Sequence, residues 1–247
     1  MKTSGNVILI TGGGSGIGRE LARRFNDLGN DVIVAGRRRD ALDETIAGRT
    51  GMHAIELDVE SAESIAAFAA KLIAEHPRLN VVINNAGMMR TDDLTRGDGL
   101  NGAEETIVTN LLGPIRLNAA LVDHLRTQAD AAIVNVSSGL AFVPFPKAPV
   151  YSATKAAIHS YTVILREQLR GSIEVIELAP PAVQTGLTPG QSTREGYMPL
   201  QDFIDEVMGL FATQPTPAEI LVDRVKPLRF AEAEGRYDDV LAMLKSL

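Results

Sequence analysis

The sequence repeatedly alternates a short apolar run with a longer amphipathic segment, and this alternation restricts its fold more than any other feature. Six runs have strand character, at residues 7–10, 32–35, 52–57, 81–84, 131–137 and 173–179. Helical patterns lie between them, at residues 17–28, about 40–48, 61–75, 102–127 and 152–170. Because most of the runs are apolar throughout, we expect helices on both faces of their sheet. The pattern predicts an α/β fold with a doubly wound parallel sheet, which binds ligands beyond the carboxyl ends of its strands.

The composition excludes several kinds of partner. A chain of 247 residues, 45% of them apolar, can form one domain around a substantial core. Its formal net charge of -7 argues against nucleic acid or an anionic membrane as a partner. The sequence contains no cysteine, no secretory leader and no stretch of roughly 18 apolar residues that could cross a membrane. We therefore expect a cytoplasmic protein, and because its histidines lack metal-ligand spacing, we expect no metal site.

A glycine-rich segment, TGGGSGIG at residues 11–18, follows the first apolar run and opens an amphipathic helix. Five glycines in eight positions are more than a turn requires. Their spacing fits neither G-x-G-x-x-G nor the phosphate-loop pattern, in which lysine and a hydroxyl would replace Arg19 and Glu20. A strand, a glycine loop and a helix N-terminus nevertheless form an anion site. The spacing T-G-x-x-x-G-x-G leaves Gly13 and Gly14 without a role and predicts that phosphate binds near Gly12, Ser15, Gly16, Ile17 and Gly18.

The ends of the next two runs indicate which phosphate-bearing ligand this is. NAD-binding folds usually carry Asp or Glu about 20 residues after the glycine loop, whereas Arg accommodates the 2′-phosphate of NADP. Arg37 occupies that position here and the first carboxylate is Asp40, so we expect NADP(H) to be preferred. NAD(H) stays open as an alternative because the glycine loop has no lysine. After the third run, the backbone of Val59 lies at the rim beside Asp58, which can bind the adenine amino group or cap the next helix.

The fourth and fifth runs are followed by residues suited to chemistry. NNAG at residues 84–87 offers Asn85, Ala86 and Gly87 as a surface for a flat ligand, although a plain turn has the same composition. Ser138 ends the fifth run, and thirteen residues later Tyr151 begins a helical segment with Lys155 at i+4. The phenol and the ammonium therefore share one helical face. Since a free tyrosine has a pKa near 10 and a nearby ammonium lowers that pKa, the pair is suited to acid–base catalysis.

Together, TGGGSGIG, NNAG, Ser138 and the Y-x-x-x-K of Tyr151 and Lys155 resemble the short-chain dehydrogenase/reductase (SDR) family, over about residues 5–187. The resemblance implies a single Rossmann-type domain and an NADP(H)-dependent oxidoreductase that interconverts a carbonyl and an alcohol. In the implied mechanism Ser138 binds the substrate carbonyl and Tyr151 is the general acid or base. Lys155 lowers the pKa of Tyr151 and holds the nicotinamide ribose, while Asn110 positions a water that relays protons.

The segment after the sixth run departs from the family pattern. The family has Pro-Gly there, whereas Pro180 is followed by Pro181, which removes flexibility and a backbone donor. Thr185 and the backbone of Val183 still resemble the family's contacts to nicotinamide. The stretches SSGLAFVPFP, YSATKAAIHSYTVILREQLR and VIELAPPAVQTGL resemble a subgroup associated with D-alanine esterification of teichoic acids, a label that describes a genomic neighbourhood more than a chemistry.

The patterns and the resemblance divide the single domain into four parts. We expect residues 1–130 mainly to bind the cofactor, 131–185 to carry catalysis, 186–214 to form a substrate loop or lid, and 215–247 to form a C-terminal helical tail. Leu140, Phe142 and Phe145 are expected to form an apolar wall, which favours an apolar small-molecule substrate. The resemblance further implies a homodimer. The alternative function is a non-catalytic NADP(H)-binding sensor.

Overall fold

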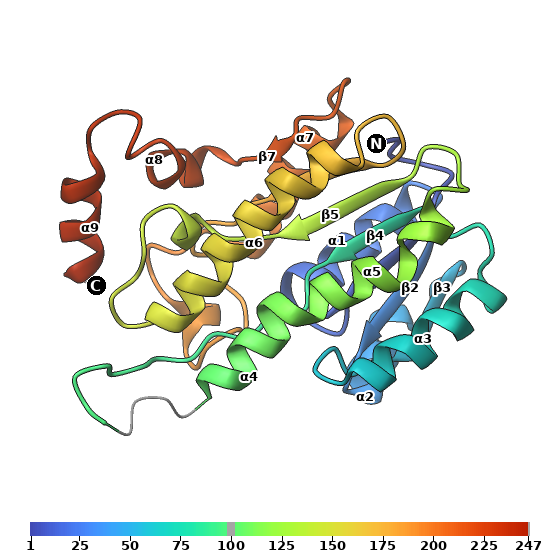
Figure 1. The fold of residues 1–247 in the computed structure, drawn as a ribbon, viewed down its shortest axis with the longest axis horizontal. Coiled ribbons are helices and arrows are strands. Elements are labelled where there is room, and N and C mark those ends of the chain that lie inside the picture. Colours follow the sequence, from blue (N-terminus) through green and yellow to red (C-terminus); the bar gives the residue numbers. More distant parts are fainter. Residues whose placement is uncertain (98–101, 247) are drawn as a thin grey trace.

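The structure is a computed structural model that describes residues 1–97 and 102–246 (Figure 1). Within these residues, one parallel sheet of seven strands runs in the order β3-β2-β1-β4-β5-β6-β7. The strands are β1 (Val7–Thr11), β2 (Asp31–Gly36), β3 (Met52–Glu56), β4 (Val81–Asn84), β5 (Ala132–Val136), β6 (Glu174–Leu178) and β7 (Glu219–Ile220). The strand order changes direction between β1 and β4, and a crevice for a ligand opens at such a point.

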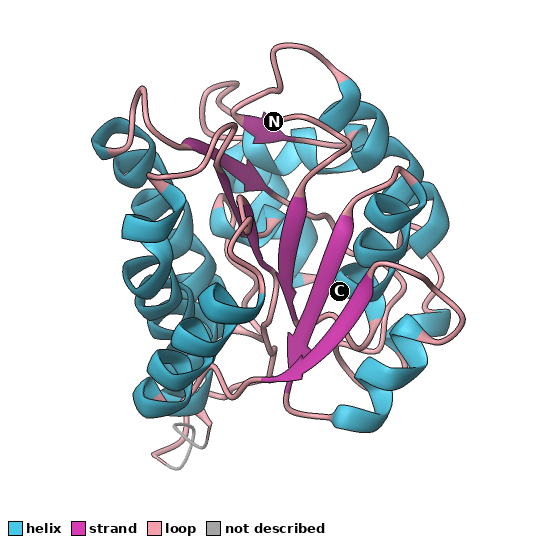
Figure 2. Ribbon diagram, turned by 90° about the vertical axis from the view of Figure 1, so that its right-hand side faces the viewer, coloured by secondary structure: helices cyan, strands magenta, loops and turns pink. Residues whose placement is uncertain are grey.

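The helices lie in two layers with the sheet between them (Figure 2). They are α1 (Gly16–Asp27), α2 (Arg39–Ile46), α3 (Ala62–Glu75), α4 (Ala103–Ile107), α5 (Gly113–Leu125), α6 (Pro149–Gln168), α7 (Leu200–Ala212), α8 (Lys226–Arg229) and α9 (Tyr237–Lys245). Side chains alternate between the two faces of each strand. Ile8 of β1 accordingly joins the core beneath α1 and α7, whereas Leu9 joins the core beneath α3 and α5.

The predicted fold class is confirmed, and each of the six predicted strands occurs within one residue of its expected bounds. The long helix expected at residues 102–127 is interrupted by a π-helical turn, Val108–Leu112, between α4 and α5. The seventh strand, β7, escaped prediction because two residues are too few to show a periodic pattern. Among the described residues, no helix has the length and apolar character that crossing a membrane requires.

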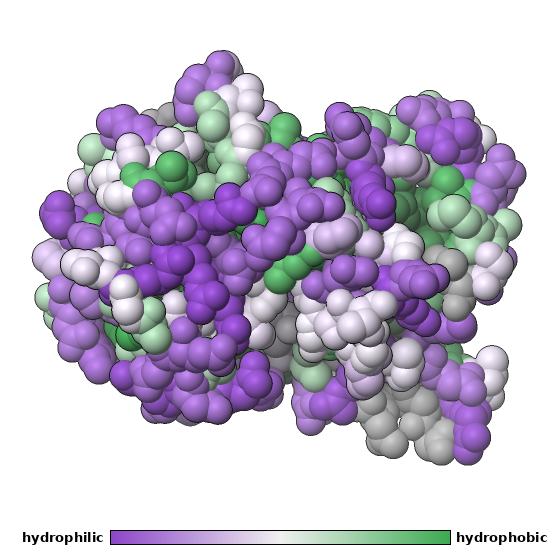
Figure 3. All heavy atoms as spheres, turned by 180° about the vertical axis from the view of Figure 1, so that it is seen from behind, coloured by the Kyte–Doolittle hydropathy of each residue, from purple (hydrophilic) through white to green (hydrophobic). Residues whose placement is uncertain are grey.

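The C-terminal part of the chain adds a third, smaller core at one end of the molecule. The predicted tail helix is present as α9, and its Val240 and Leu244 pack against Val143 of the loop between β5 and α6. In Figure 1, α8 and α9 lie beside that loop, at the end of the molecule far from β3. Seen from behind, the surface is mainly hydrophilic, with apolar side chains in small separate groups (Figure 3). The apolar residues of the tail thus serve mostly to cover the loop after β5.

Candidate active site

Two adjoining cavities lie at the carboxyl ends of the strands, where the fold predicts a ligand. The larger, here called the catalytic cavity, has a volume of about 320 Å³ and is bordered by Ser138, Tyr151 and Lys155. The smaller, here called the outer cavity, has a volume of about 210 Å³ and is bordered by Arg37 and Val59. Both share one set of lining residues, namely Gly12, Ser15, Arg38, Ala86, Gly87 and Met88. The two cavities therefore form one elongated depression that an extended ligand can occupy.

Most of the residues singled out in the sequence border this depression. In the catalytic cavity these are Gly12, Ser15, Gly16, Ile17, Asn85, Ala86, Gly87, Ser138, Tyr151, Lys155, Pro180, Val183 and Thr185. Arg37 and Val59 line the outer cavity. Six others do not line either cavity: Gly18, Asp58, Asn110, Leu140, Phe142 and Phe145. The following contacts explain why.

The glycine loop lies tightly against the NNAG turn. A Cβ on Gly12 would lie 2.9 Å from the Cα of Ala86, and a Cβ on Gly18 would lie 2.5 Å from the carbonyl oxygen of Gly12. Thr11 joins the two segments, because its Oγ1 accepts hydrogen bonds from the backbone N–H groups of Asn85 (3.1 Å) and Ala86 (3.0 Å). Gly18 thus keeps the loop closed from behind rather than touching the ligand. The resulting cradle leaves the start of α1 open to a phosphate group.

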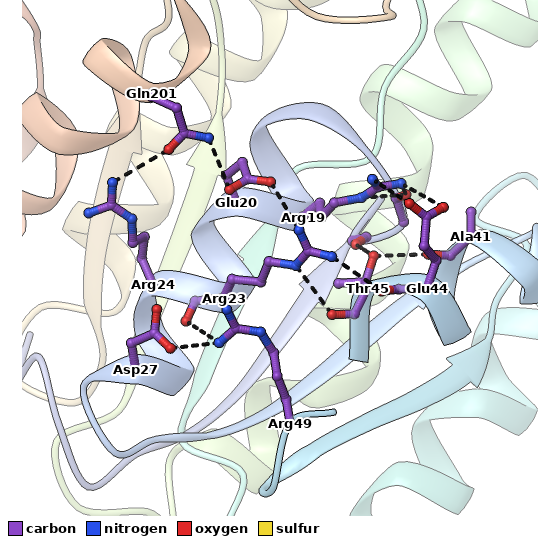
Figure 4. A network of polar contacts seen from close by, with 12 residues as sticks. Arg19, Glu20, Arg23, Arg24, Asp27, Ala41, Glu44, Thr45, Arg49 and Gln201 are labelled. Carbon is purple, nitrogen blue, oxygen red and sulfur yellow. Dashed lines mark hydrogen bonds and ion pairs between the residues drawn. The ribbon is translucent and has the colours of Figure 1, made fainter. Parts of the chain in front are cut away.

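Gly13 and Gly14, which had no role in the sequence pattern, allow the loop to pack on its neighbours. A Cβ on Gly13 would lie 2.6 Å from the Cβ of Val34 in β2, and one on Gly14 would lie 3.1 Å from the Cβ of Ala41 in α2. Arg19 and Thr45, which lie between α1 and α2 in Figure 4, then hold the loop by its carbonyl groups. Arg19 Nη2 donates to Gly14 O at 2.7 Å and Thr45 Oγ1 donates to Gly13 O at 3.0 Å.

The basic residues after β2 have different surroundings. Arg37 Nη1 forms an ion pair with Glu60 Oε1 at 3.0 Å, and the same oxygen accepts a hydrogen bond from Thr109. Arg38 borders both cavities. Position along the sequence favours Arg37 and gives Arg38 less weight, whereas both arginines border the outer cavity and Arg38 borders the catalytic cavity as well. Arg38 is therefore the better placed of the two to reach a ligand in the depression.

Asp58 takes part in a local turn. Its Oδ1 accepts a hydrogen bond from the backbone N–H of Glu60 at 3.0 Å. The helix cap considered for Asp58 is provided instead by Ser61, whose Oγ accepts from the N–H of Ser64 at 3.1 Å. The prediction that Asp58 caps the next helix is therefore wrong, because α3 begins one residue after Ser61 and Asp58 lies too far from its first turn.

Ser138, Tyr151 and Lys155 converge although two different elements carry them. Ser138 follows β5, while Tyr151 and Lys155 lie one turn apart on α6, and all three side chains are buried. Lys155 Nζ donates to the backbone oxygen of Val136 at 2.8 Å and lies 5.6 Å from the centre of the Tyr151 ring. Ser138 Oγ accepts a hydrogen bond from the backbone N–H of Leu140 at 3.1 Å, which fixes its hydroxyl at the end of β5. The strand end and the helix are thus locked together around the phenol.

Burial dominates the protonation of this group. Burial raises the pKa of Tyr151 to about 12, and the hydrogen bond with Ser138 opposes that rise. Burial lowers the pKa of Lys155 to about 8, and the negative charge of Glu177 opposes that fall. In this structure the hydrogen bond with Ser138 lowers the pKa of Tyr151. That Lys155 lowers the same pKa stays a prediction. Bringing that pKa from 12 to neutrality would take roughly 7 kcal/mol.

Asn110 lies in the π-helical turn, next to the catalytic cavity. Its Nδ2 donates to Met88 O at 2.8 Å and to Thr154 Oγ1 at 3.2 Å, and its Oδ1 accepts from the backbone N–H of Met88 at 2.9 Å. Gly87 separates Asn110 from Lys155, because a Cβ on Gly87 would lie 3.2 Å from Asn110 Oδ1 and 3.7 Å from Lys155 Nζ. One lone pair of Oδ1 remains for a further donor such as water.

The segment after β6 contains a cavity-lining residue, Gln191, that the sequence patterns do not single out. Gln191 is buried, and its Nε2 donates to Val183 O at 2.8 Å and to Thr185 Oγ1 at 3.1 Å. It borders the catalytic cavity together with Pro181 and Leu187. A polar residue in a turn-rich stretch gives no sequence signal for such a contact, since the partner is set by how the loop folds back.

Leu140, Phe142 and Phe145 are turned away from the catalytic cavity. Leu140 and Phe145 pack in the small core around α9. The Phe142 ring lies edge-on to that of His159, with centres 5.0 Å apart, and the Arg229 guanidinium lies 4.9 Å from its centre. The C-terminal segment therefore covers these apolar side chains. The expected substrate loop is likewise divided, because residues 186–187 border the cavity whereas Phe203 of α7 is fully buried beside the sheet.

Comparisons with known proteins agree with this geometry. A family model described as short chain dehydrogenase matches residues 6–196. The uncharacterized oxidoreductase DltE of Bacillus subtilis is 41% identical, over 100% of this chain and 99% of that protein. Sulfoacetaldehyde reductase 2 of Chromohalobacter salexigens is 30% identical, over 94% of this chain and 97% of that protein. A short-chain dehydrogenase from Sphingobium yanoikuyae, solved in complex with NADPH, has a TM-score of 0.80 and 25% identity, covering 96% of this chain and 95% of that one.

Proposed function

The chain belongs to the short chain dehydrogenase family, and from this premise we propose that it is an NADP(H)-dependent oxidoreductase that interconverts a carbonyl and an alcohol. The observation that carries the proposal is the convergence of Ser138, Tyr151 and Lys155 in a cavity that the glycine loop also borders. A proton donor and an anion-binding loop in one depression are what carbonyl reduction by a dinucleotide requires.

The glycine loop supports the choice of a dinucleotide. The first turn of α1 has no acidic residue, and the side chain of Ser15 does not cap it, so its N–H groups can bind a pyrophosphate. Arg38 can pair with a 2′-phosphate, and the similar S. yanoikuyae enzyme was solved with NADPH. NAD(H) is the alternative cofactor. When bound, the dinucleotide supplies or accepts the hydride.

The side chains divide the remaining chemistry among them. Ser138 donates a hydrogen bond to the substrate carbonyl and orients it toward Tyr151, the general acid. Because burial holds the pKa of Tyr151 near 12, the phenol stays protonated at neutral pH and is ready to donate its proton to a developing alkoxide. Lys155 provides a positive charge beside the phenol, and Asn110 positions a water that returns the proton.

We further propose a small, largely apolar carbonyl compound as the substrate. Beside Ser138 and Tyr151 the catalytic cavity is bordered by Met88, Pro181 and Leu187, which offer apolar contacts. Small aldehydes are the first compounds to test, because the relative from C. salexigens is named a sulfoacetaldehyde reductase. Sulfoacetaldehyde is an anion, so uncharged and anionic aldehydes are compared, and turnover of the anionic ones alone would contradict an apolar substrate.

The proposal is tested by following NADPH oxidation by the purified protein with a panel of ketones and aldehydes. Tyr151→Phe should lower turnover about 100- to 10,000-fold and leave NADPH binding intact, because the phenyl ring keeps the packing and loses only the proton. Tyr161→Phe, on the same helix, is the matched control and should retain turnover. If NADPH binds but no compound is reduced, and Tyr151→Phe binds it equally well, the protein is a cofactor sensor and the proposal fails.

A further inference from the structure

A charged side chain lies behind the catalytic cavity, and the mechanism above does not use it. Glu177 of β6 has no exposed surface. A carboxylate that is removed from water destabilises a fold unless hydrogen bonds and opposite charges compensate it. Its partners therefore show what it does for this protein.

The two oxygens of Glu177 bind the two elements that carry the catalytic side chains. Oε1 accepts a hydrogen bond from Ser137 Oγ, and Ser137 directly precedes Ser138. Oε2 lies 2.8 Å from Nδ1 of His159, which follows Lys155 by four residues on α6. Tyr151, Lys155 and His159 thus lie on one face of α6. Glu177 connects the end of β5 to this face one turn beyond Lys155.

A second ion pair completes the cluster from the C-terminal segment. Glu219 of β7 is the register partner of Glu177, so the two carboxylates point to the same side of the sheet. Arg229 of α8 binds Glu219 with Nε and Nη2, at 2.9 Å and 3.0 Å. The nitrogen and oxygen atoms of His159, Glu177 and Glu219 lie within 4.8 Å of one another, as in a metal site. Arg229 and the Ser137 hydroxyl already bind these oxygens, so no metal is inferred.

The charges around His159 favour the protonated form of its imidazole. Two carboxylates and the guanidinium sum to one negative charge. The pKa of His159 is raised, first of all by its hydrogen bond to Glu177 and then by the charges of Glu177 and Glu219, against burial and the charge of Arg229. Glu177 also opposes the loss of the proton from Lys155. The one buried carboxylate therefore contacts His159 directly, and its charge also acts on Lys155, one turn earlier on the same helix.

We propose that Glu177 is a positioning residue of the catalytic centre, which binds Ser137 and His159, aligns the end of β5 with α6, and places a buried negative charge behind the helix that carries Lys155. The inference rests on the proposed function, since it assumes that the reaction uses Lys155 as an ammonium.

The test is the pH profile of kcat/KM in Glu177→Gln, a variant of equal size that can still form hydrogen bonds. Without the charge, Lys155 loses its proton more easily, so the alkaline limb should move to lower pH by about one unit. Glu177→Asp keeps the charge and should retain the wild-type limb. Glu174→Gln is the matched control on the same strand, where Glu174 binds the N-terminal amino group, and its profile should not change.

Histidine resonances provide a readout that needs neither cofactor nor substrate. In NMR titrations the midpoint of His159 should fall in Glu177→Gln, because the neutral amide no longer stabilises the imidazolium. His159→Gln replaces the imidazole that binds Glu177 Oε2 with an amide, and it should lower kcat with KM nearly unchanged if this contact aligns α6, which keeps the proposal testable if Glu177→Gln does not fold.

Failure of this inference and failure of the proposed function are distinguishable. If Glu177→Gln lowers the melting temperature but leaves the alkaline limb of the kcat/KM profile in place, Glu177 has a structural role alone. That result would overturn the inference. If Tyr151→Phe retains full turnover, the proposed function is wrong, and the His159 titration alone then decides whether Glu177 sets the charge of this cluster. An unchanged midpoint in Glu177→Gln overturns the inference in that case as well.

Discussion

Lys155 should destabilise the folded protein at neutral pH, although the proposed reaction uses its positive charge. Burial lowers the pKa of Lys155 from its ordinary value of 10.5 to about 8, so at pH 7 the fold holds a buried ammonium that water would solvate better. At about 1.36 kcal/mol per pKa unit, this lowers the free energy of unfolding by roughly 3 kcal/mol. Lys155→Met has a similar length and no charge, and therefore removes this term together with the hydrogen bond to Val136.

The pH dependence isolates the charge from the other consequences of the substitution. Between pH 8 and 10.5 the folded protein has released the proton of Lys155 and the unfolded chain still holds it, so the wild type gains stability as the pH rises. Lys155→Met lacks this gain. The difference in free energy of unfolding between the two proteins should change by about 2 to 3 kcal/mol in favour of the wild type between pH 7 and pH 10.

Urea denaturation of both proteins at the two pH values measures this difference, and other titrating groups largely cancel. Lys71→Met is the matched control, because the Lys71 side chain is 58% exposed and its replacement should give nearly the same difference at both pH values. Lys155→Met should also lose turnover. A wild-type-minus-variant difference that is equal at pH 7 and pH 10 would refute the view that Lys155 is a destabilising buried ammonium.

Two further substitutions test the cofactor site. Gly18→Ala places a Cβ 2.4 Å from Asn85 Nδ2 and 2.5 Å from Gly12 O. Calorimetry should therefore show a free energy of unfolding that is lower by about 1 to 3 kcal/mol, and titration with NADPH should show roughly tenfold weaker binding. Gly209→Ala, where a Cβ meets open space, is its control, and equal stability of the two variants would contradict the packing argument. Arg38→Ala should weaken NADPH binding relative to NADH about 10-fold or more, and Arg37→Ala less, since Arg37 pairs with Glu60. A larger effect at Arg37 in the same titrations would restore the sequence-based assignment.

Much of the fold could be predicted because its causes are local. An apolar run of four or five residues, as at Val81–Asn84, makes a buried strand whatever its neighbours are, and alternation with helices leaves few topologies. The spacing of Tyr151 and Lys155 is equally local, since four residues are about one helical turn. The NADP(H) preference also came from a position counted along the chain. Such features can be predicted from the sequence because they depend on residues that are close to one another along the chain.

The candidate site shows where this reasoning ends. Leu140 and Phe145 have the composition of a substrate wall, but α9 covers them, and no periodicity relates residues 140–145 to a helix a hundred positions later. Arg38 and Gln191 border the cavity only because of how their loops turn. The sequence pattern also predicts regular helix at Asn110, because it does not distinguish a π-helical turn from an α-helix.

The sequence by itself determined the first six strands, the glycine loop, the family and the Tyr151–Lys155 pair, because each follows from residues within a few positions or from a motif. Only the tertiary structure decided that Glu177 lies beside Glu219, with Ser137, His159 and Arg229 around them. The physical reason is that strand register and helix packing bring these charges together from four separate segments, around a carboxylate of Glu177 that is fully removed from water. Burial, in the same way, sets which protons Tyr151 and Lys155 hold.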